Sequence, residues 1–168
     1  MKSIIILSII LLFNTLTAQQ IAIGFDVSNA IQGSEVNVPS LDIQAKISDI
    51  TDHREIGLAF EYFKEIDYFS MSMYANKIIP INNFRLLAGV EVVQIIRGKF
   101  TSFAYGFNGE TRYFFTDKMA IGLQYNYRRR TDLQLLYNDG RFVGSGFINL
   151  IYKWKWLKTF TKVGKQRQ

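Results

Sequence analysis

Residues 103–127 read FAYGFNGETRYFFTDKMAIGLQYNY and contain two segments whose side chains alternate in character. One parity is apolar and mostly aromatic: Phe103, Tyr105, Phe107, Tyr113, Phe115, Ile121, Leu123, Tyr125 and Tyr127. The other parity is small, polar or charged: Ala104, Gly106, Asn108, Glu110, Arg112, Ala120, Gly122, Gln124 and Asn126. Because successive side chains on a strand point to opposite faces, the stretch predicts a two-faced β-hairpin that turns at Thr116-Asp117-Lys118.

Two classes of protein contain hairpins of this kind. In a water-soluble β-protein the apolar face packs in the core and the polar face meets solvent. In a transmembrane β-barrel the apolar face meets lipid, so Glu110, Arg112 and Gln124 would point into the lumen. The rest of the sequence favours the membrane barrel.

The first 18 residues are predicted to be a signal peptide. Lys2 precedes an apolar run from Ile4 to Phe13, and the small residues Thr17 and Ala18 precede the expected cleavage site near Ala18/Gln19. A positive start, a short apolar run and small residues before the cleavage site are typical of secretory signals. The run is too short for the ~20 apolar residues that a membrane-spanning helix needs. We therefore expect the chain to be exported.

The segment 19–168 has the length of one domain and a basic charge balance. Its 150 residues include 19 basic and 14 acidic side chains, a formal charge of +5. A basic exported chain suits an anionic membrane surface, and no nucleic acid partner is expected because no basic helix or nucleic-acid motif is present. The chain has no cysteine, which excludes disulfides and a lipid-modified cysteine.

Strand-like alternation recurs in eight segments of the chain. They are residues 21–28, 38–48, 54–63, 67–77, 84–96, 101–115, 118–129 and 142–156. Most are long enough for the ~9–11 residues with which a tilted strand crosses a bilayer. The pattern predicts an all-β fold, an antiparallel up-and-down transmembrane β-barrel of about eight strands over residues 19–156. Residues 157–168 are predicted to be a short basic periplasmic tail.

The polar parity of these segments predicts a plugged lumen. It carries six acidic and six basic residues, together with small residues such as Gly106 and Gly122. The interior of an eight-stranded barrel is just wide enough to be filled by side chains, and buried charges need partners. The predicted lumen charge network consists of Glu61, Arg85, Glu91, Glu110, Arg112 and Arg128.

Loop lengths and one arginine cluster predict the orientation and a lipid contact. With the mature N-terminus in the periplasm, the two longest connections, 29–37 and 130–141, lie outside the cell, as in outer-membrane barrels. Arg128-Arg129-Arg130 then ends a strand at the outer rim. Because the planar guanidinium fork suits phosphate, we predict that Arg129 and Arg130 contact lipopolysaccharide, with a contribution from Lys99.

Two segments resemble the small outer-membrane β-barrels of Gram-negative bacteria, such as the OmpA transmembrane domain and OmpX. They are RYFFTDKMA (112–120) and the last strand, Gly146 to Trp156, with its alternating hydrophobics and terminal aromatic residues. The signal, which ends in TAQQ (17–20), resembles that of Bacteroidetes exports. The resemblance covers residues 19–156 and implies location in the cell outer membrane, contact with its lipid, and insertion by the barrel-assembly machinery. Unlike many of these proteins, the chain continues beyond its terminal aromatic residue.

Catalysis is not expected. His53 is the only histidine and lies in a predicted turn, so the chain offers no imidazole or thiolate metal site, and no cofactor is expected. We therefore expect a monomeric barrel, not an enzyme, with a structural, membrane-integrity or surface-interaction role. Three alternatives stay open: a narrow pore or small-solute transporter, a subunit of a secretion or motility assembly that binds other envelope proteins, and a secreted soluble β-barrel that binds an apolar ligand.

Overall fold

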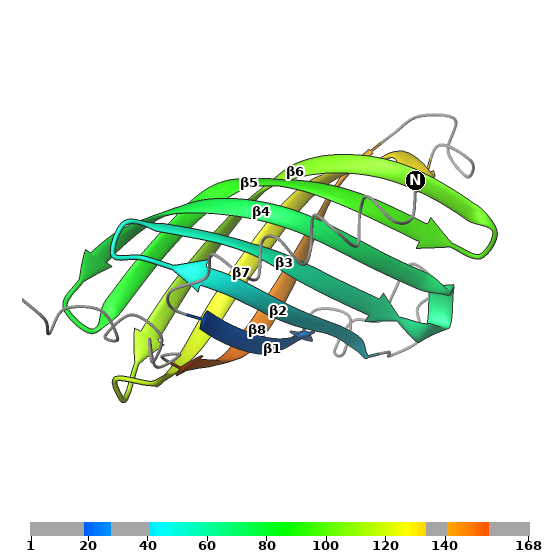
Figure 1. Ribbon diagram of the computed structural model, residues 1–168. Coiled ribbons are helices and arrows are strands. Elements are labelled where there is room, and N and C mark those ends of the chain that lie inside the picture. Colours follow the sequence, from blue (N-terminus) through cyan, green and yellow to red (C-terminus); the bar gives the residue numbers. More distant parts are fainter. Residues whose placement is uncertain (1–18, 28–40, 134–140, 155–168) are drawn as a thin grey trace, which may run out of the picture.

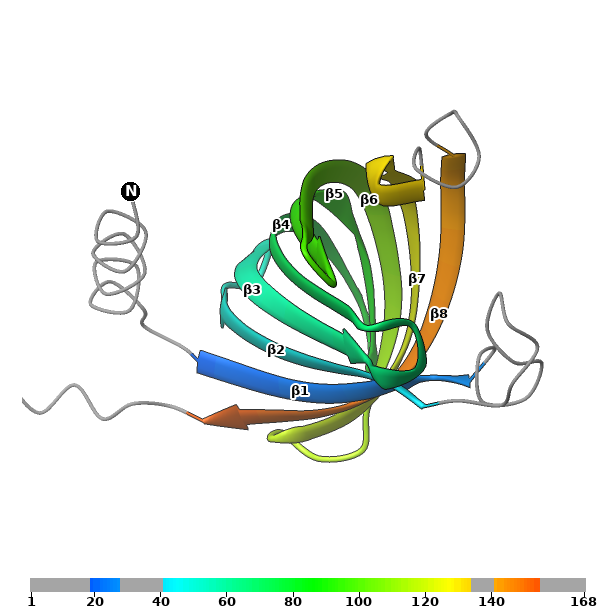
Figure 2. The ribbon, with the colours of Figure 1, turned by 90° about the vertical axis from the view of Figure 1, so that its right-hand side faces the viewer.

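The protein is an eight-stranded closed barrel. The computed structural model describes residues 19–27, 41–133 and 141–154. The strands are β1 (Gln19–Asp26), β2 (Asp42–Ile50), β3 (Arg54–Phe63), β4 (Tyr68–Ile81), β5 (Phe84–Arg97), β6 (Phe100–Phe114), β7 (Met119–Arg130) and β8 (Arg141–Trp154). Each strand pairs antiparallel with its neighbours in sequence, and β1 also pairs with β8, which closes the sheet (Figures 1 and 2). The predicted antiparallel up-and-down barrel of eight strands is confirmed.

The barrel has two different ends. At the turn end, on the left in Figure 1, short connections join β2 to β3, β4 to β5 and β6 to β7. Gln19 and Trp154, which pair across β1 and β8, also lie at this end. At the loop end, the 3-10 helix η1 (Lys64–Ile66) follows β3 and the 3-10 helix η2 (Thr131–Leu133) follows β7.

Several strand limits differ from those predicted. The fourth strand extends to Ile81, beyond the predicted 67–77, because its pairing with β5 continues as far as Ile81 and Phe84. The predicted signal peptide, the long connection after β1 and the tail 157–168 lie outside the described residues. No helix in the described ranges is long and apolar enough to cross a membrane.

The apolar parity of each strand lies on the outside of the barrel. On the hairpin of β6 and β7, Phe103 is 68% and Leu123 63% exposed, whereas Ala104 is 3% and Gln124 8% exposed. This arrangement is the inverse of a water-soluble core, because the large apolar side chains surround the sheet and the polar side chains fill it. It is the arrangement expected of a barrel whose outer face meets lipid.

Local turn chemistry fixes the short connections at the turn end. Asn82, between β4 and β5, has a positive φ of 53°, a conformation that asparagine tolerates better than most residues. Between β6 and β7, the Thr116 hydroxyl oxygen accepts hydrogen bonds from the backbone N–H groups of Lys118, at 3.3 Å, and Met119, at 2.9 Å. These contacts stabilise the register of the hairpins. The register in turn determines the position of each inward-facing side chain along the barrel axis.

Candidate functional site in the barrel interior

The interior nearest the turn end holds one cluster of buried charges, the turn-end cluster, formed by Lys46, Glu55, Glu110 and Arg112. The Nη2 of Arg112, on β6, lies 2.8 Å from the Oε2 of Glu55 on β3 and 2.6 Å from the Oε2 of Glu110. The Nζ of Lys46, on β2, lies 2.8 Å from the same Glu110 oxygen. Because β2 and β3 are not neighbours of β6 in the barrel, the pairs of Arg112 with Glu55 and of Lys46 with Glu110 cross the lumen.

Neutral side chains complete the hydrogen bonding of this cluster. The Oε1 of Glu55 accepts hydrogen bonds from the hydroxyls of Ser48, at 2.7 Å, and Tyr74, at 3.2 Å. The Oε1 of Glu110 accepts one from the amide of Asn149 at 3.0 Å. A buried ion pair is stable only if its remaining lone pairs are satisfied, and here they largely are.

The second cluster, the loop-end cluster, is built on Arg128 of β7. Its guanidinium donates to Glu61 of β3 through Nη1, and to Glu91 of β5 through Nε, at 2.5 Å, and Nη2, at 3.2 Å. Arg128 is 3%, Glu61 5% and Glu91 4% exposed. The guanidinium of Arg128 therefore links β7 to β3 and β5 across the part of the interior nearer the loop end.

Little space remains between the two clusters. The cavity that separates them has a volume of about 10 Å³ and is lined by Lys46, Tyr74, Glu91, Asn108 and Gln124, among others. A cavity of this volume holds about one water molecule.

Apolar side chains close the interior near both ends. Toward the loop end, the buried residues Phe63, Tyr68, Val93, Ile95 and Ala104 form a cluster inside the sheet. Toward the turn end, Ala22, Ala120 and Ile151 pack together beneath the partly buried ring of Phe114. The barrel interior thus holds two neighbouring ionic clusters, with apolar side chains packed toward each end.

Two glycines make room for the charged clusters. A Cβ atom at Gly122 would lie 2.5 Å from the Oε1 of Glu110, and one at Gly106 would lie 2.6 Å from the Tyr127 carbonyl oxygen and 3.0 Å from the Cγ of Arg128. At these two positions, a side chain larger than that of glycine would crowd the neighbouring strand or the charged cluster.

The structure brings together five of the six residues predicted to form the lumen network. They fall into the two clusters described above, with Glu110 and Arg112 in one, and Glu61, Glu91 and Arg128 in the other. Arg85 does not join either cluster. Lys46 and Glu55 are central members of the turn-end cluster that the predicted network lacked. The alternation shows which side chains point inward, but not which of them lie at the same level along the barrel axis.

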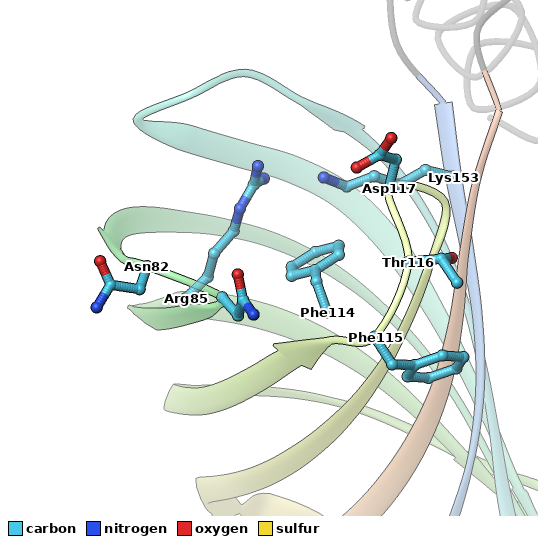
Figure 3. A pocket seen from close by; sticks show the side chains of 8 residues that line it. Asn82, Arg85, Phe114, Phe115, Thr116, Asp117 and Lys153 are labelled. Atoms are coloured by element: carbon cyan, nitrogen blue, oxygen red, sulfur yellow. The ribbon is translucent and has the colours of Figure 1, made fainter.

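Arg85 lies instead at the turn end, beside Lys153 of β8. The Cζ of Arg85 lies 4.8 Å, and the Nζ of Lys153 4.2 Å, from the centroid of the Phe114 ring. Figure 3 shows both side chains reaching toward the space over this ring. Neither forms an ion pair within the described part of the chain.

The residues predicted to contact lipopolysaccharide separate into two groups. Arg130 turns inward: its guanidinium pairs with Asp132 at 2.6 Å and lies 4.5 Å from the centroid of the Tyr68 ring. Arg129 lies on the outward parity, where its Nη1 donates to the Tyr105 hydroxyl at 3.2 Å. Lys99 is exposed in the connection between β5 and β6. Arg129 and Lys99 therefore lie on the outer surface, and Arg130 is engaged within the loop end.

No metal-binding chemistry is found in the parts of the chain that the structure describes. Within them, no group of three or more histidine, cysteine, aspartate or glutamate side chains is arranged to hold a metal ion. The acidic side chains of the two clusters instead face arginine and lysine.

Comparison with known proteins gives structural likeness without sequence likeness. No protein-family model matches the chain, and no curated protein matches it significantly. The outer membrane protein Ail of Yersinia pestis superposes with a TM-score of 0.52 at 16% identity, over 82% of this chain and 99% of Ail. The N-terminal β-barrel domain of OprF from Pseudomonas aeruginosa gives 0.55 at 11% identity, over 83% and 98%. A de novo designed transmembrane β-barrel gives 0.55 at 6% identity, over 83% and 98%.

The fold and the interior define the structural class. The closed sheet of eight strands, the apolar outer face and the ionic interior are those of a small transmembrane β-barrel. The structure is similar to those of small outer-membrane barrels.

Proposed function

We propose that the protein is an integral outer-membrane β-barrel with a non-catalytic structural, membrane-integrity or surface-interaction role. The observation that carries the proposal is the pairing of Arg112 with Glu55, and of Arg128 with Glu61, across the lumen. Side chains that bridge opposite walls leave no path for solute, so the interior acts as a structural core. The surface is then the part of the molecule available for interactions.

The outer surface supports membrane insertion. Large apolar side chains on all the strands are exposed around the barrel, among them Ile23 at 58%, Val92 at 61% and Leu150 at 56%. A surface of this kind is unfavourable in water and suited to hydrocarbon. In the proposed orientation the turn end faces the periplasm and the loop end faces the outside, after export and cleavage near Ala18/Gln19.

The proposed partners follow from this location. Outer-membrane lipid surrounds the barrel, lipopolysaccharide meets Arg129 and Lys99 at the loop end, and the barrel-assembly machinery inserts the chain during biogenesis. We propose a monomer, with other envelope proteins as partners of the loops.

Two measurements test the proposal together. Cell fractionation, combined with electrophoresis of boiled and unboiled samples, should recover the protein in the outer-membrane fraction as a heat-modifiable band. Recovery in the soluble periplasm without detergent would contradict membrane insertion. Planar-bilayer recordings of the folded protein should give no defined conductance steps, whereas reproducible steps would favour the narrow-pore alternative over the plugged barrel.

A further inference from the structure

A pocket of about 370 Å³ opens at the turn end of the barrel (Figure 3). Its lining includes Asn82, Asn83, Arg85, Phe114, Thr116 and Lys153. These residues come from the β4–β5 turn, the start of β5, the β6–β7 hairpin and β8, which the fold brings together at this end of the barrel. Pockets that hold small ligands have volumes of about 300–1,000 Å³, so this one is large enough for an organic anion.

The pocket contains two cationic groups whose charges are not neutralised by a contact. Arg85 and Lys153 both rest against the Phe114 ring, and neither forms an ion pair among the described residues. Every other charged side chain that points into the described interior near this end, by contrast, belongs to the turn-end cluster and has an opposite charge within 3 Å. Two like charges held on one aromatic ring repel each other, and an anion placed between them would remove that repulsion.

The residues that line the pocket carry a net charge of +1, from Arg85, Lys153 and Asp117. Asp117, in the β6–β7 turn, is the one carboxylate in the lining. Asp52, in the β2–β3 turn, acts on Arg85 and Lys153 by longer-range attraction. The charge of Arg112, deeper in the barrel, is offset by its pairing with Glu55 and Glu110.

Backbone hydrogen bonds hold the pocket walls in place. The Phe114 N–H donates to the Asn83 carbonyl at 2.9 Å, and the Lys153 N–H donates to the Lys118 carbonyl at 2.8 Å. The aromatic base and the two cations therefore sit on fixed strand ends, so little ordering is needed before a ligand binds.

The donor types in the lining match a phosphate group. A guanidinium fork and an ammonium group, which both lie against the Phe114 ring, can together donate to several oxygens of one tetrahedral anion. We propose that this pocket binds a phosphate group, with Arg85 and Lys153 as the charged contacts. The phosphate can belong to a soluble ion or ester, or to a phospholipid headgroup at the neighbouring membrane surface.

The test is a titration of the folded barrel in a maltoside detergent, which contains no phosphorus. Backbone amide chemical shifts are followed while sodium phosphate, and in a second arm glycerol phosphate, is added against sodium chloride at matched ionic strength. A third arm adds phosphatidylglycerol to the micelles. We expect saturable shifts at Asn83, Phe114 and Thr116. Shifts in the first two arms identify a soluble ligand, and shifts in the third arm alone identify a headgroup.

Variants distinguish the pocket from general surface charge. Arg85→Gln combined with Lys153→Gln should weaken binding by about tenfold or more, because charge-assisted hydrogen bonds are lost. Lys118→Gln removes a nearby exposed charge outside the pocket and should leave the affinity within about twofold. Arg85→Lys combined with Lys153→Arg keeps the charge and should retain measurable binding. Heat-modifiability confirms that each variant is folded. The absence of saturable shifts in all arms, equal shifts with chloride, or an equal loss in Lys118→Gln would overturn the proposal.

Discussion

The guanidinium of Arg112 lies 2.8 Å from the carboxylate of Glu55, although the two residues are separated by 57 positions in sequence and lie on strands that are not neighbours. Both side chains are fully buried, with 0% exposure. The contact ties β6 to β3 through the centre of the barrel and supplements the hydrogen bonds between adjacent strands. Arg112 also contacts Glu110, so Arg112 and Lys46 together balance the charges of the two carboxylates.

Replacing Arg112 with methionine should therefore destabilise the barrel strongly. The change leaves Glu55 without a cationic partner and leaves Glu110 with Lys46 alone. Removing one partner of a buried ion pair costs about 3–5 kcal/mol. The loss is measured as a change in the free energy of unfolding in urea, followed by tryptophan fluorescence in detergent or lipid.

An exposed arginine, Arg54, provides the control for this substitution. Arg54 is exposed at the start of β3, and Arg54→Met should change the free energy of unfolding by no more than about 0.5 kcal/mol. Equal effects of the two substitutions would mean that the cross-lumen pair contributes nothing beyond a surface charge.

Gly122→Ala should also destabilise the turn-end cluster. The new methyl group would lie 2.5 Å from the Oε1 of Glu110, so the carboxylate must move away from Lys46 and Arg112. Overpacking of this kind costs about 1–3 kcal/mol. Gly146 on β8 is the matched control, because a Cβ there meets nothing within 4 Å. Gly146→Ala should leave the urea midpoint unchanged, and an equal shift for both variants would contradict the crowding at Gly122.

Alternation in the sequence was enough to predict the strands, their antiparallel order and the inward direction of the charges. It was not enough to predict which charges meet, because pairing depends on the stagger between strands on opposite walls. Arg85 and Arg112 illustrate this limit. They lie opposite each other in the register of β5 and β6. Arg112 nevertheless reaches into the turn-end cluster, whereas Arg85 lies over the Phe114 ring at the turn end of the barrel.

The interior apolar layers were missed for a related reason. Phe63, Val93 and Ile95 point inward near the loop end, in stretches where the sequence has apolar residues on both parities. In such stretches the sequence does not show which side chains point into the barrel. Their direction is determined only by the pairing with the neighbouring strands.

A charge on the outer surface should be costly in proportion to its depth. Leu123 is 63% exposed on β7, in the middle part of the hairpin, and Leu123→Lys should cost about 2–4 kcal/mol if it lies near the bilayer midplane. Phe115 is 49% exposed just beyond the end of β6, and Phe115→Lys should cost about 0–1 kcal/mol. Unfolding free energies in lipid vesicles measure both. Equal costs at the two positions would contradict a bilayer centred on the strands.

The two arginines at the end of β7 should respond differently to substitution. Arg129 lies on the outward parity at the loop end, where it can meet lipopolysaccharide phosphates, whereas Arg130 pairs with Asp132 and covers the Tyr68 ring. Arg129→Gln should weaken lipopolysaccharide binding about two- to fivefold, the loss of one partly exposed ionic contact. Arg130→Gln should leave that affinity unchanged and lower the free energy of unfolding by about 1 kcal/mol.

Lipopolysaccharide binding to the reconstituted barrel measures the first effect, and urea unfolding measures the second. Lys77 is an exposed basic residue in the half of β4 nearer the turn end, so Lys77→Gln removes the same charge far from the loop end and should change neither quantity. If Arg130→Gln weakened lipopolysaccharide binding as much as Arg129→Gln, both guanidinium groups would face the lipid and the inward pairing of Arg130 would not persist in the membrane. If only Lys77→Gln had an effect, the bound lipid would lie at the opposite rim, and the proposed orientation would have to be reversed.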